Sequence, residues 1–415
     1  MPSPYRALFA APGTMAFSTA GLVGRLPLAM TGVGVLAMIS ELTGSYRLAG
    51  LVTATIALAA AAIGPQIARL VDRHGQTKVL RPATLVAAGS GAGLILCATA
   101  DAPVWTFFVF AVGAGSVPSV GSMVRARWAA IYRGRSELHT AYSWEATVDE
   151  ICFIAGPPLA IGLSTGWFPA AGPLLAGMFL LIGVFWLTAQ KATEPVPAPR
   201  DEHTAGSALA SRGLQVLVVT CVATGVVFGS VEVVSVAFAD ELGNKAASSL
   251  ALAIYAAGSC LAGLVFGLLR LKGAAGPRWL LGVCAMAVSL IPLQFVASLP
   301  ALCVTLFFAG LAIAPTMVTT MGLVASHVPG TKLTEGMTWV STGLAVGVAL
   351  GSGAAGTAVD EWGARAAYGV PGVAGALAAV VAFLGYRRLR EPAPTTEGQP
   401  VDEHDQQGEQ DARLA

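Results

Sequence analysis

Twelve apolar runs, each long enough to cross a lipid bilayer, constrain the fold of this chain more than any other feature. A spanning helix needs about 20 mostly apolar residues. Charged residues make up 11% of the 415 positions, against about 25% in soluble domains. The predicted fold class is therefore an all-α membrane protein with twelve transmembrane helices. The expected spans are 15–40, 47–70, 79–100, 103–124, 141–164, 170–190, 214–239, 247–270, 278–297, 300–324, 335–358 and 366–386.

The longest polar break between these runs, residues 191–212, divides them into two blocks of six. It combines several prolines with charges of both signs, a composition typical of a flexible linker. We therefore expect an N-terminal six-helix half at 1–190 and a C-terminal six-helix half at 213–390. Residues 391–415 are acidic and contain few apolar residues, which predicts a disordered tail.

The two predicted halves contain related sequence. Trp144 and Gly156 recur 195 residues later as Trp339 and Gly351, and both pairs lie on the fifth helix of their half. Parallel repeats of six helices are typical of transporters that bind substrate near the membrane midplane between the halves. The alternative is chance similarity between two helices rich in Ala and Gly.

Basic residues are concentrated on one side of the predicted bundle. If the N-terminus lies inside, the outside segments hold Arg47, Lys245 and Arg365, and nearly all other Lys and Arg residues lie inside. Cytoplasmic loops carry such an excess, so both termini are expected in the cytoplasm. The expected location is the cell membrane, as a multi-pass protein of the plasma or inner membrane of a bacterium.

The sequence contains no pattern that indicates an enzyme or a cofactor site. It has no Walker loop, no dinucleotide fingerprint and no catalytic arrangement of Ser, His and Asp. All six cysteines lie in apolar runs without metal-ligand spacing, so we expect them to be small core residues. We predict no enzymatic activity, no cofactor and no metal site. A net charge of +1 gives no reason to expect nucleic acid binding.

Three carboxylates, Glu145, Asp149 and Glu150, lie close together inside the fifth predicted span. Glu145 and Asp149 are four residues apart and share a helix face, whereas Glu150 is turned about 100° away from Asp149. A charge at bilayer depth costs about 2.5–3.5 kcal/mol on insertion scales, so such residues usually face a partner or a water-filled cavity. They indicate either a functional site or a buried ion pair that holds helices together.

Arg25 lies within the first span, at a depth similar to that of Asp149 and Glu150. We expect Arg25 to pair with one of these two carboxylates, because a guanidinium is permanently charged and binds a carboxylate as a fork. Crowded acids resist ionising together, so at least one carboxylate is expected to take up a proton near neutral pH. Protonation would weaken the pair with Arg25 and couple proton movement to the substrate. The alternative is a static, structural triad.

Three further residues have two interpretations each. Glu232, in the seventh span, either lines an outer vestibule or reaches the lipid headgroups. Trp144 and Trp339 either flank the substrate pathway or belong to the aromatic belt at the membrane interface, and we favour the belt.

The end of the second span and the loop that leads to the third contain the most specific motif. It includes Gly64, Arg69, Asp72, Arg73 and Gly75, with further basic residues after them. This pattern resembles motif A of the major facilitator superfamily (MFS). Together with twelve spans, a central linker and related halves, the resemblance extends over nearly the whole chain. It implies the MFS fold and alternating access, driven by an ion gradient or by the substrate's own gradient.

The charges of this segment also predict a role. Asp72 lies beside a basic cluster with Arg69 and Arg73, and ion pairs here can form in one conformation and break in another. Anchoring of the loop by positive charge explains the arginines but not an acid between glycines, so we favour gating. The matching loop of the second half, 267–273, lacks an acid, which predicts an asymmetric latch.

Two other family motifs match loosely. Motif C of the antiporter branches is a Gly-Pro signature on the fifth helix, where this chain has Gly156 and Pro157 but Cys152 in place of an earlier glycine. It weakly favours export, and an ordinary helix kink is the alternative. Motif B of the proton-coupled branches has an arginine within the fourth helix, where this chain has none before Arg125, at the expected cytoplasmic end. Arg25 is expected to take that role instead.

These observations favour a drug or metabolite efflux-like branch of the family. The predicted function is secondary transport: export of small molecules in exchange for protons by a monomer in the lipid bilayer. One alternative is uptake of a small metabolite by proton symport. Another is a membrane sensor or scaffold that keeps the fold without transport, and the paired acids at midplane argue against it.

Overall fold

The computed structural model describes residues 4–100, 102–197, 206–243, 247–269 and 273–389, and their regular elements are helical, which confirms the all-α class. The first group of helices comprises α1 (Pro4–Leu8), α2 (Thr14–Thr43), α3 (Tyr46–His74), α4 (Gln76–Thr99), α5 (Val104–Ala114), α6 (Val120–Tyr132), α7 (Glu137–Gly166) and α8 (Ala171–Ala189). The second group comprises α9 (Arg212–Glu241), α10 (Ala247–Leu268), α11 (Ala275–Ser289), α12 (Leu299–Gly310), α13 (Ile313–His327), α14 (Leu333–Ala367) and α15 (Gly369–Gly385). Short 3₁₀ helices are η1 (Lys191–Thr193), η3 (Ala208–Ala210), η4 (Ile291–Phe295), η5 (Gly330–Lys332) and η6 (Tyr386–Leu389).

Eleven helical segments of the described chain are long and apolar enough to cross a membrane. The fourth predicted span, 103–124, is instead divided into α5 and α6, and α5 alone is short for a span. Gly115 lies so close to α3 that an added Cβ would be 2.8 Å from the Ala60 amide nitrogen. Pro118 lacks the N–H that a continuous helix needs. A continuous apolar run therefore overestimates the length of a single helix here.

Glycines bring long helices of each group into close contact. On α7, a Cβ at Gly156 would lie 2.8 Å from the Ala29 Cβ of α2, and α7 continues as a helix past Pro157 to its end. On α14, a Cβ at Gly351 would overlap the Val226 carbonyl oxygen of α9. Gly156 and Gly351, which are 195 residues apart, thus lie at equivalent contacts. One is between α7 and α2 in the first group, and the other is between α14 and α9 in the second.

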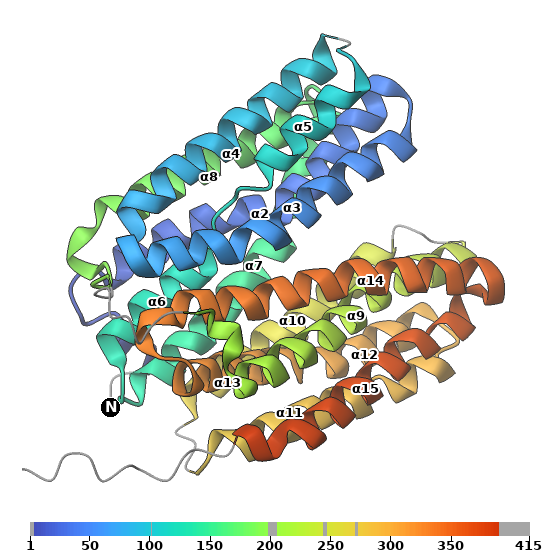
Figure 1. Ribbon diagram of the computed structural model, residues 1–415. Coiled ribbons are helices and arrows are strands. Elements are labelled where there is room, and N and C mark those ends of the chain that lie inside the picture. Colours follow the sequence, from blue (N-terminus) through green and yellow to red (C-terminus); the bar gives the residue numbers. More distant parts are fainter. Residues whose placement is uncertain (1–3, 101, 198–205, 244–246, 270–272, 390–415) are drawn as a thin grey trace, which may run out of the picture.

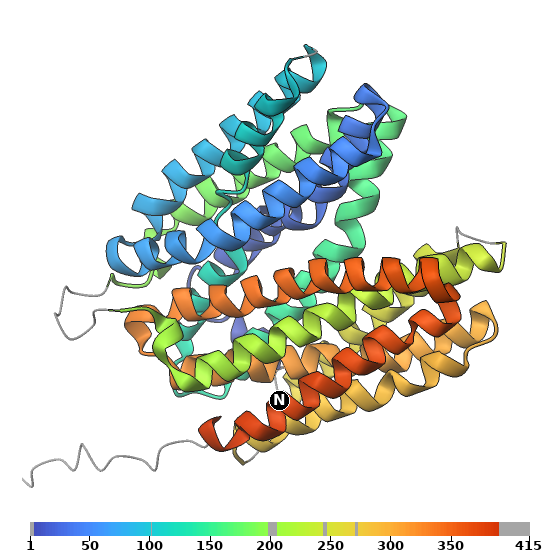
Figure 2. The same cartoon turned by 45° about the vertical axis from the view of Figure 1, so that its right-hand side comes forward.

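The two groups lie side by side, close together at one end and diverging toward the other (Figures 1 and 2). Helix α10 packs on α7, and α14 packs on α3. The largest cluster of buried apolar side chains includes members of both groups, such as Trp128 and Val324. Elsewhere each group has its own cluster, around Ile39 in the first and Leu302 in the second. Arg69 and other basic residues lie at the end where the groups meet, and we call this end the basic end.

Helix α14 is interrupted near the other end of the molecule. Gly363 has a left-handed φ of 80°, and the helix restarts directly after it. The Ala364 amide nitrogen donates to Glu241 Oε1, 2.7 Å away, at the end of α9. A side chain of another helix therefore supplies the acceptor that the restarting segment needs.

The predicted linker is only partly described. Its first part contains η1 and its last part η3, and both parts make hydrogen bonds to the helix groups. Residues 198–205 of the linker lie outside the described residues, as does the predicted acidic tail at 391–415.

Candidate functional site

Arg25 of α2 binds two carboxylates of α7. Its Nη1 lies 2.9 Å from Asp149 Oδ1, one of the two carboxylates predicted as its partner, and its Nη2 forms an ion pair with Glu145. The side chains of Arg25 and Glu145 are 3% and 0% exposed. The spacing of four residues places both acids on the helix face that meets α2. Pairing with Glu145 as well as Asp149 makes this a three-residue buried cluster.

A second arginine joins the cluster, which the sequence reasoning placed wrongly. Arg125 was expected at the end of the fourth helix, but α6 extends to Tyr132, so Arg125 lies within the helix and is buried. Its Nη2 pairs with Asp149 Oδ2. The expected lack of an arginine within the fourth helix is therefore wrong. Gly121, one turn earlier, leaves the room: a Cβ there would be 3.0 Å from Arg125 Nη1 and 3.6 Å from Arg25 Nε.

The cluster contains two positive and two negative side chains, and one of the four is partly exposed. Trp128 Nε1 donates to Glu145 Oε1 at 2.7 Å, which gives the most buried acid a further partner. The Asp149 side chain is 32% exposed, whereas those of Arg25 and Arg125 are 3% and 8% exposed. Removing one partner of a buried ion pair leaves an uncompensated charge, which costs about 3–5 kcal/mol. Asp149 is thus the most exposed member of the cluster, and it pairs with both arginines.

Glu150 and Glu232 lie apart from this cluster. Glu150 does not pair with Arg25; instead it accepts a hydrogen bond at Oε1 from Ser259 Oγ of α10, 2.6 Å away. This contact joins the two groups of helices. Glu232 of α9 is exposed, and the described hydrogen bonds and ion pairs do not connect it to the cluster. In the described part of the chain no group of His, Cys, Asp and Glu side chains is suited to hold a metal ion.

A second set of charges joins α3 to α14 at the basic end. Asp72 Oδ2 accepts a hydrogen bond from the Glu335 amide nitrogen, 2.9 Å away, in the first turn of α14. Arg69 Nε lies 3.0 Å from Glu335 Oε1. Lys332, at the N-cap position of α14, provides no side-chain cap, so Asp72 supplies that acceptor from another helix. A carboxylate is favoured there, because amide groups and dipole make a helix start positive. We call this the α3–α14 contact.

The other residues of the motif surround that contact. Arg73 has an exposed side chain at the end of α3, and the described ion pairs do not include it. Gly75 has φ of 91°, which a side chain would strain, and it makes the turn from α3 to α4. Gly64 is buried, and a Cβ there would meet the Thr338 methyl group at 3.8 Å. The structure thus brings Asp72 and Arg69 to the other group, but not Arg73.

The matching contact between α10 and α7 is made by a hydroxyl and an imidazole. Thr140 Oγ1 donates to the Gly267 carbonyl oxygen at 2.9 Å, and His139 Nε2 donates to the Phe266 carbonyl oxygen at 2.9 Å. Both acceptors lie in the last turn of α10, whose carbonyl groups form the negative end of the helix. We call this the α10–α7 contact.

Both tryptophans of the repeat form hydrogen bonds inside the protein. Trp144 Nε1 donates to Ser18 Oγ at 2.8 Å, and the Trp144 ring meets Phe9 edge-on with 5.5 Å between centroids. Trp339 Nε1 donates to Glu335 Oε1 at 3.3 Å. Trp339 therefore shares Glu335 with Arg69, while Trp144 packs on the N-terminal segment.

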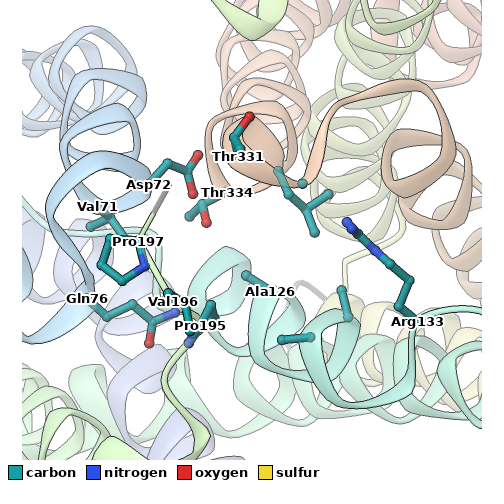
Figure 3. A pocket seen from close by; sticks show the side chains of 14 residues that line it. Val71, Asp72, Gln76, Ala126, Arg133, Pro195, Val196, Pro197, Thr331 and Thr334 are labelled. Atoms are coloured by element: carbon teal, nitrogen blue, oxygen red, sulfur yellow. The ribbon is translucent and has the colours of Figure 1, made fainter. Parts of the chain in front are cut away.

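A pocket of about 470 Å³ opens beside the α3–α14 contact. Figure 3 shows the Asp72 carboxylate and the Thr334 side chain next to each other on one wall, with Arg133 on another. The lining residues are Val71, Asp72, Gln76, Ala126, Ala129, Ala130, Arg133, Pro195, Val196, Pro197, Gly330, Thr331, Leu333 and Thr334. The linker therefore forms part of the wall at the place where the groups meet.

Sequence reasoning missed Glu335 and Arg125. Glu335 was not a candidate, although it lies 195 residues after Thr140, the offset of the internal repeat. An acid in the first turn of a predicted helix, on the basic side of the membrane, was the available signal. For Arg125 the signal was Pro118, which restarts the helix and moves its end toward Tyr132.

Comparison with known proteins identifies the family. The family model described as Major Facilitator Superfamily matches residues 17–243 and 216–407. A search of curated proteins gave no match. Among solved structures, the chain is similar to the human organic anion transporter MFSD10 (TETRAN), with 15% identity, a TM-score of 0.62 and coverage of 94% of this chain and 100% of that chain.

Two further solved structures resemble the chain. One is a bacterial homologue of the iron transporter ferroportin in the outward-facing state, with 15% identity, a TM-score of 0.70 and coverage of 89% of this chain and 99% of that chain. The other is the MFS transporter FucP in the outward conformation, with 12% identity, a TM-score of 0.66 and coverage of 89% and 98%. At such identities these likenesses show the fold, while the family model shows membership. The chain is a multi-pass membrane transporter that belongs to the major facilitator superfamily.

Proposed function

We propose that this chain is a secondary transporter that works by alternating access and exports small molecules in exchange for protons. Its halves are 1–190 and 213–390. Helices α5 and α6 together make the fourth crossing, which brings the number of crossings to twelve. The basic end lies in the cytoplasm, as the distribution of Lys and Arg supports, and the membrane is the plasma or inner membrane of a bacterium. One observation carries the proposal: Asp149 is 32% exposed while it holds two buried guanidiniums.

The cluster can couple a proton to movement of the helices. With Asp149 charged, Arg25 of α2 and Arg125 of α6 are held against α7. A proton on Asp149 cancels its charge and weakens both pairs, so the positions of α2, α6 and α7 respond to protonation. A ligand can shift such an equilibrium only through different affinities for the two states. A proton has different affinities for the two states here, because only the charged carboxylate binds both guanidiniums strongly.

The closed basic end supports an outward-facing state. The α3–α14 and α10–α7 contacts both join the groups there, and the apolar cluster is continuous across them. Two of the similar solved structures are described as outward-facing or outward. In the proposed cycle, these contacts break when the cytoplasmic side opens.

Proteoliposomes with an imposed pH gradient test the proposal. Substrates are first selected from the compounds to which overexpression confers resistance. Wild-type export should stop when an uncoupler removes the gradient. Arg25→Ala and Asp149→Asn should reduce coupled transport at least about a hundredfold while the protein remains in the membrane, in line with loss of about 3 kcal/mol or more from a buried pair. Normal coupled transport in both variants would refute the role of the cluster, and a chain without any flux would be a scaffold.

Uptake by proton symport is the second candidate, and Arg125 favours it. With two guanidiniums and two carboxylates the cluster is neutral, so a proton on Asp149 leaves one net positive charge. A net positive site attracts an anion, and an anion that binds together with a proton is carried in the same direction. Net accumulation of a substrate inside vesicles with an acidic exterior would favour this alternative over export.

A further inference from the structure

The first part of the linker caps a helix of the first group. Glu194 Oε1 accepts a hydrogen bond from the Thr77 amide nitrogen at 2.8 Å, and its other oxygen accepts from the Thr77 hydroxyl. Thr77 lies in the first turn of α4, whose N-cap residue Gly75 has no side chain to do this. Glu194 thus supplies the acceptor from outside the helix, as Asp72 does for α14.

A buried arginine fixes this part of the linker. Arg127 of α6 is 0% exposed. Its Nη1 donates to the Gln190 carbonyl oxygen and to Thr193 Oγ1, both at 2.8 Å, and its Nε donates to Gln76 Oε1 at 2.7 Å. One guanidinium therefore ties the start of the linker to the start of α4. A merely flexible connection would not engage a fully buried charge.

The capped start of α4 directly follows the end of α3 that carries Asp72. Asp72 lies three residues before Gly75, and the Gly75 amide donates to the Val71 carbonyl at 2.8 Å. Glu194 lies directly on the turn, because a Cβ at Gly75 would be 3.0 Å from Glu194 Oε1. A displacement of Glu194 therefore acts on the turn whose other side aims Asp72 at α14.

The last part of the linker reaches the same contact from the other side. Ser207 Oγ donates to Glu335 Oε1, the oxygen that also pairs with Arg69. The Glu335 residue is 2% exposed, so its rotamer is set by these partners. The two described ends of the linker thus bind the two partners of the α3–α14 contact.

We propose that Glu194 and Ser207 are positioning residues of the α3–α14 contact, so that the linker stabilises the closed arrangement of the two halves. Glu194 holds the turn that presents Asp72, and Ser207 holds Glu335 toward Arg69. The inference uses the closed contact of the proposed cycle but not the direction of transport. It gives the linker a role in setting how readily the basic end opens.

Hydrogen exchange of the full chain in lipid nanodiscs tests this proposal. Glu194→Ala should speed exchange about fivefold at Thr77, where the cap is lost. It should also speed exchange at the Glu335 amide in α14, by about twofold to fivefold, because Asp72 no longer holds it as firmly. Ser207→Ala should speed exchange in the same turn of α14. Glu361→Ala, at an exposed position of α14, is the matched control and should change neither segment.

A local cap would give a different result. If Glu194→Ala speeds exchange in the first turn of α4 alone, the proposal is wrong. Combination with Asp72→Ala, which removes the acceptor altogether, provides a second check, since Glu194→Ala should then add nothing at Glu335, and an additive effect would contradict the relay. Glu194→Gln keeps one acceptor oxygen and should give a smaller change at both segments, which separates capping from misfolding. No substrate is needed, so failure of the proposed transport cycle and failure of this inference are separate outcomes.

Discussion

The two contacts that join the halves at the basic end use opposite helix ends and different chemistry. In the α3–α14 contact, a carboxylate caps the positive start of a helix and a guanidinium pairs with an acid. In the α10–α7 contact, a hydroxyl and an imidazole donate to the negative end of a helix. Salt screens pairs of charged groups, whereas it has little effect on a hydroxyl that donates to a carbonyl. We infer that salt weakens the first contact more than the second.

Asp72→Asn should have the largest effect on closure. The amide keeps an acceptor but loses the negative charge at the helix start, a loss of about 1–2 kcal/mol that shifts the closed–open equilibrium about tenfold toward open. Spin labels at Lys78 and Arg387, exposed positions of the two groups, report this in a background without native cysteines. An unchanged distance distribution would show that the charge of Asp72 contributes nothing to closure.

Thr140→Val should weaken closure less. It removes one neutral hydrogen bond to the Gly267 carbonyl, worth about 1 kcal/mol net, so the same labels should show a shift of about threefold to fivefold. This shift should be the same at low and high salt. A strong salt dependence in this variant would argue against the distinction between the two contacts.

Salt should affect the wild-type protein through the α3–α14 contact. The Arg69 side chain is 31% exposed, and exposed pairs contribute about 0–1 kcal/mol and are screened by salt. Raising the salt from about 0.05 to 0.5 M should therefore shift the labels toward open by about twofold. In Glu335→Gln, which removes the pair, the salt response should largely vanish.

Raising the pH should have the smallest effect, because the third donor to α10 is a phenol. Tyr5 of α1 donates to the Leu264 carbonyl at 2.8 Å, and burial raises the pKa of Tyr5 to about 12. A pKa above its unfolded value means that this stabilisation is complete below about pH 10 and is lost as the pH rises through about 12. Comparison of tyrosinate absorbance in the wild type and in Tyr5→Phe should show no Tyr5 ionisation below pH 10.

Much of the fold and part of the site could be predicted from sequence. Apolar runs locate most helices because length and composition alone decide whether a segment can span. A contact of Arg25 with Asp149 or Glu150 was predicted because both helices start from the same side and reach the same depth. These arguments use the position of each residue along its own helix.

The features that sequence analysis did not predict depend on contacts between helices. The break before α6 lies where Gly115 meets α3; Pro118 marks it in the sequence, but no local pattern shows which helix lies opposite. It moved Arg125 from a predicted end into the cluster. Glu335 and Glu194 act through residues more than 100 positions away, so their roles require the arrangement of the two groups.

The close packing of α9 and α14 has a mechanical consequence. Glycines remove the side chains between them along their length, and Glu241 clamps the restart after Gly363. We infer that two helices joined in this way tilt as one rigid body, so a displacement of the α14 start changes the position of the other end of both helices. A solute that displaces that other end would therefore loosen the α3–α14 contact without touching it.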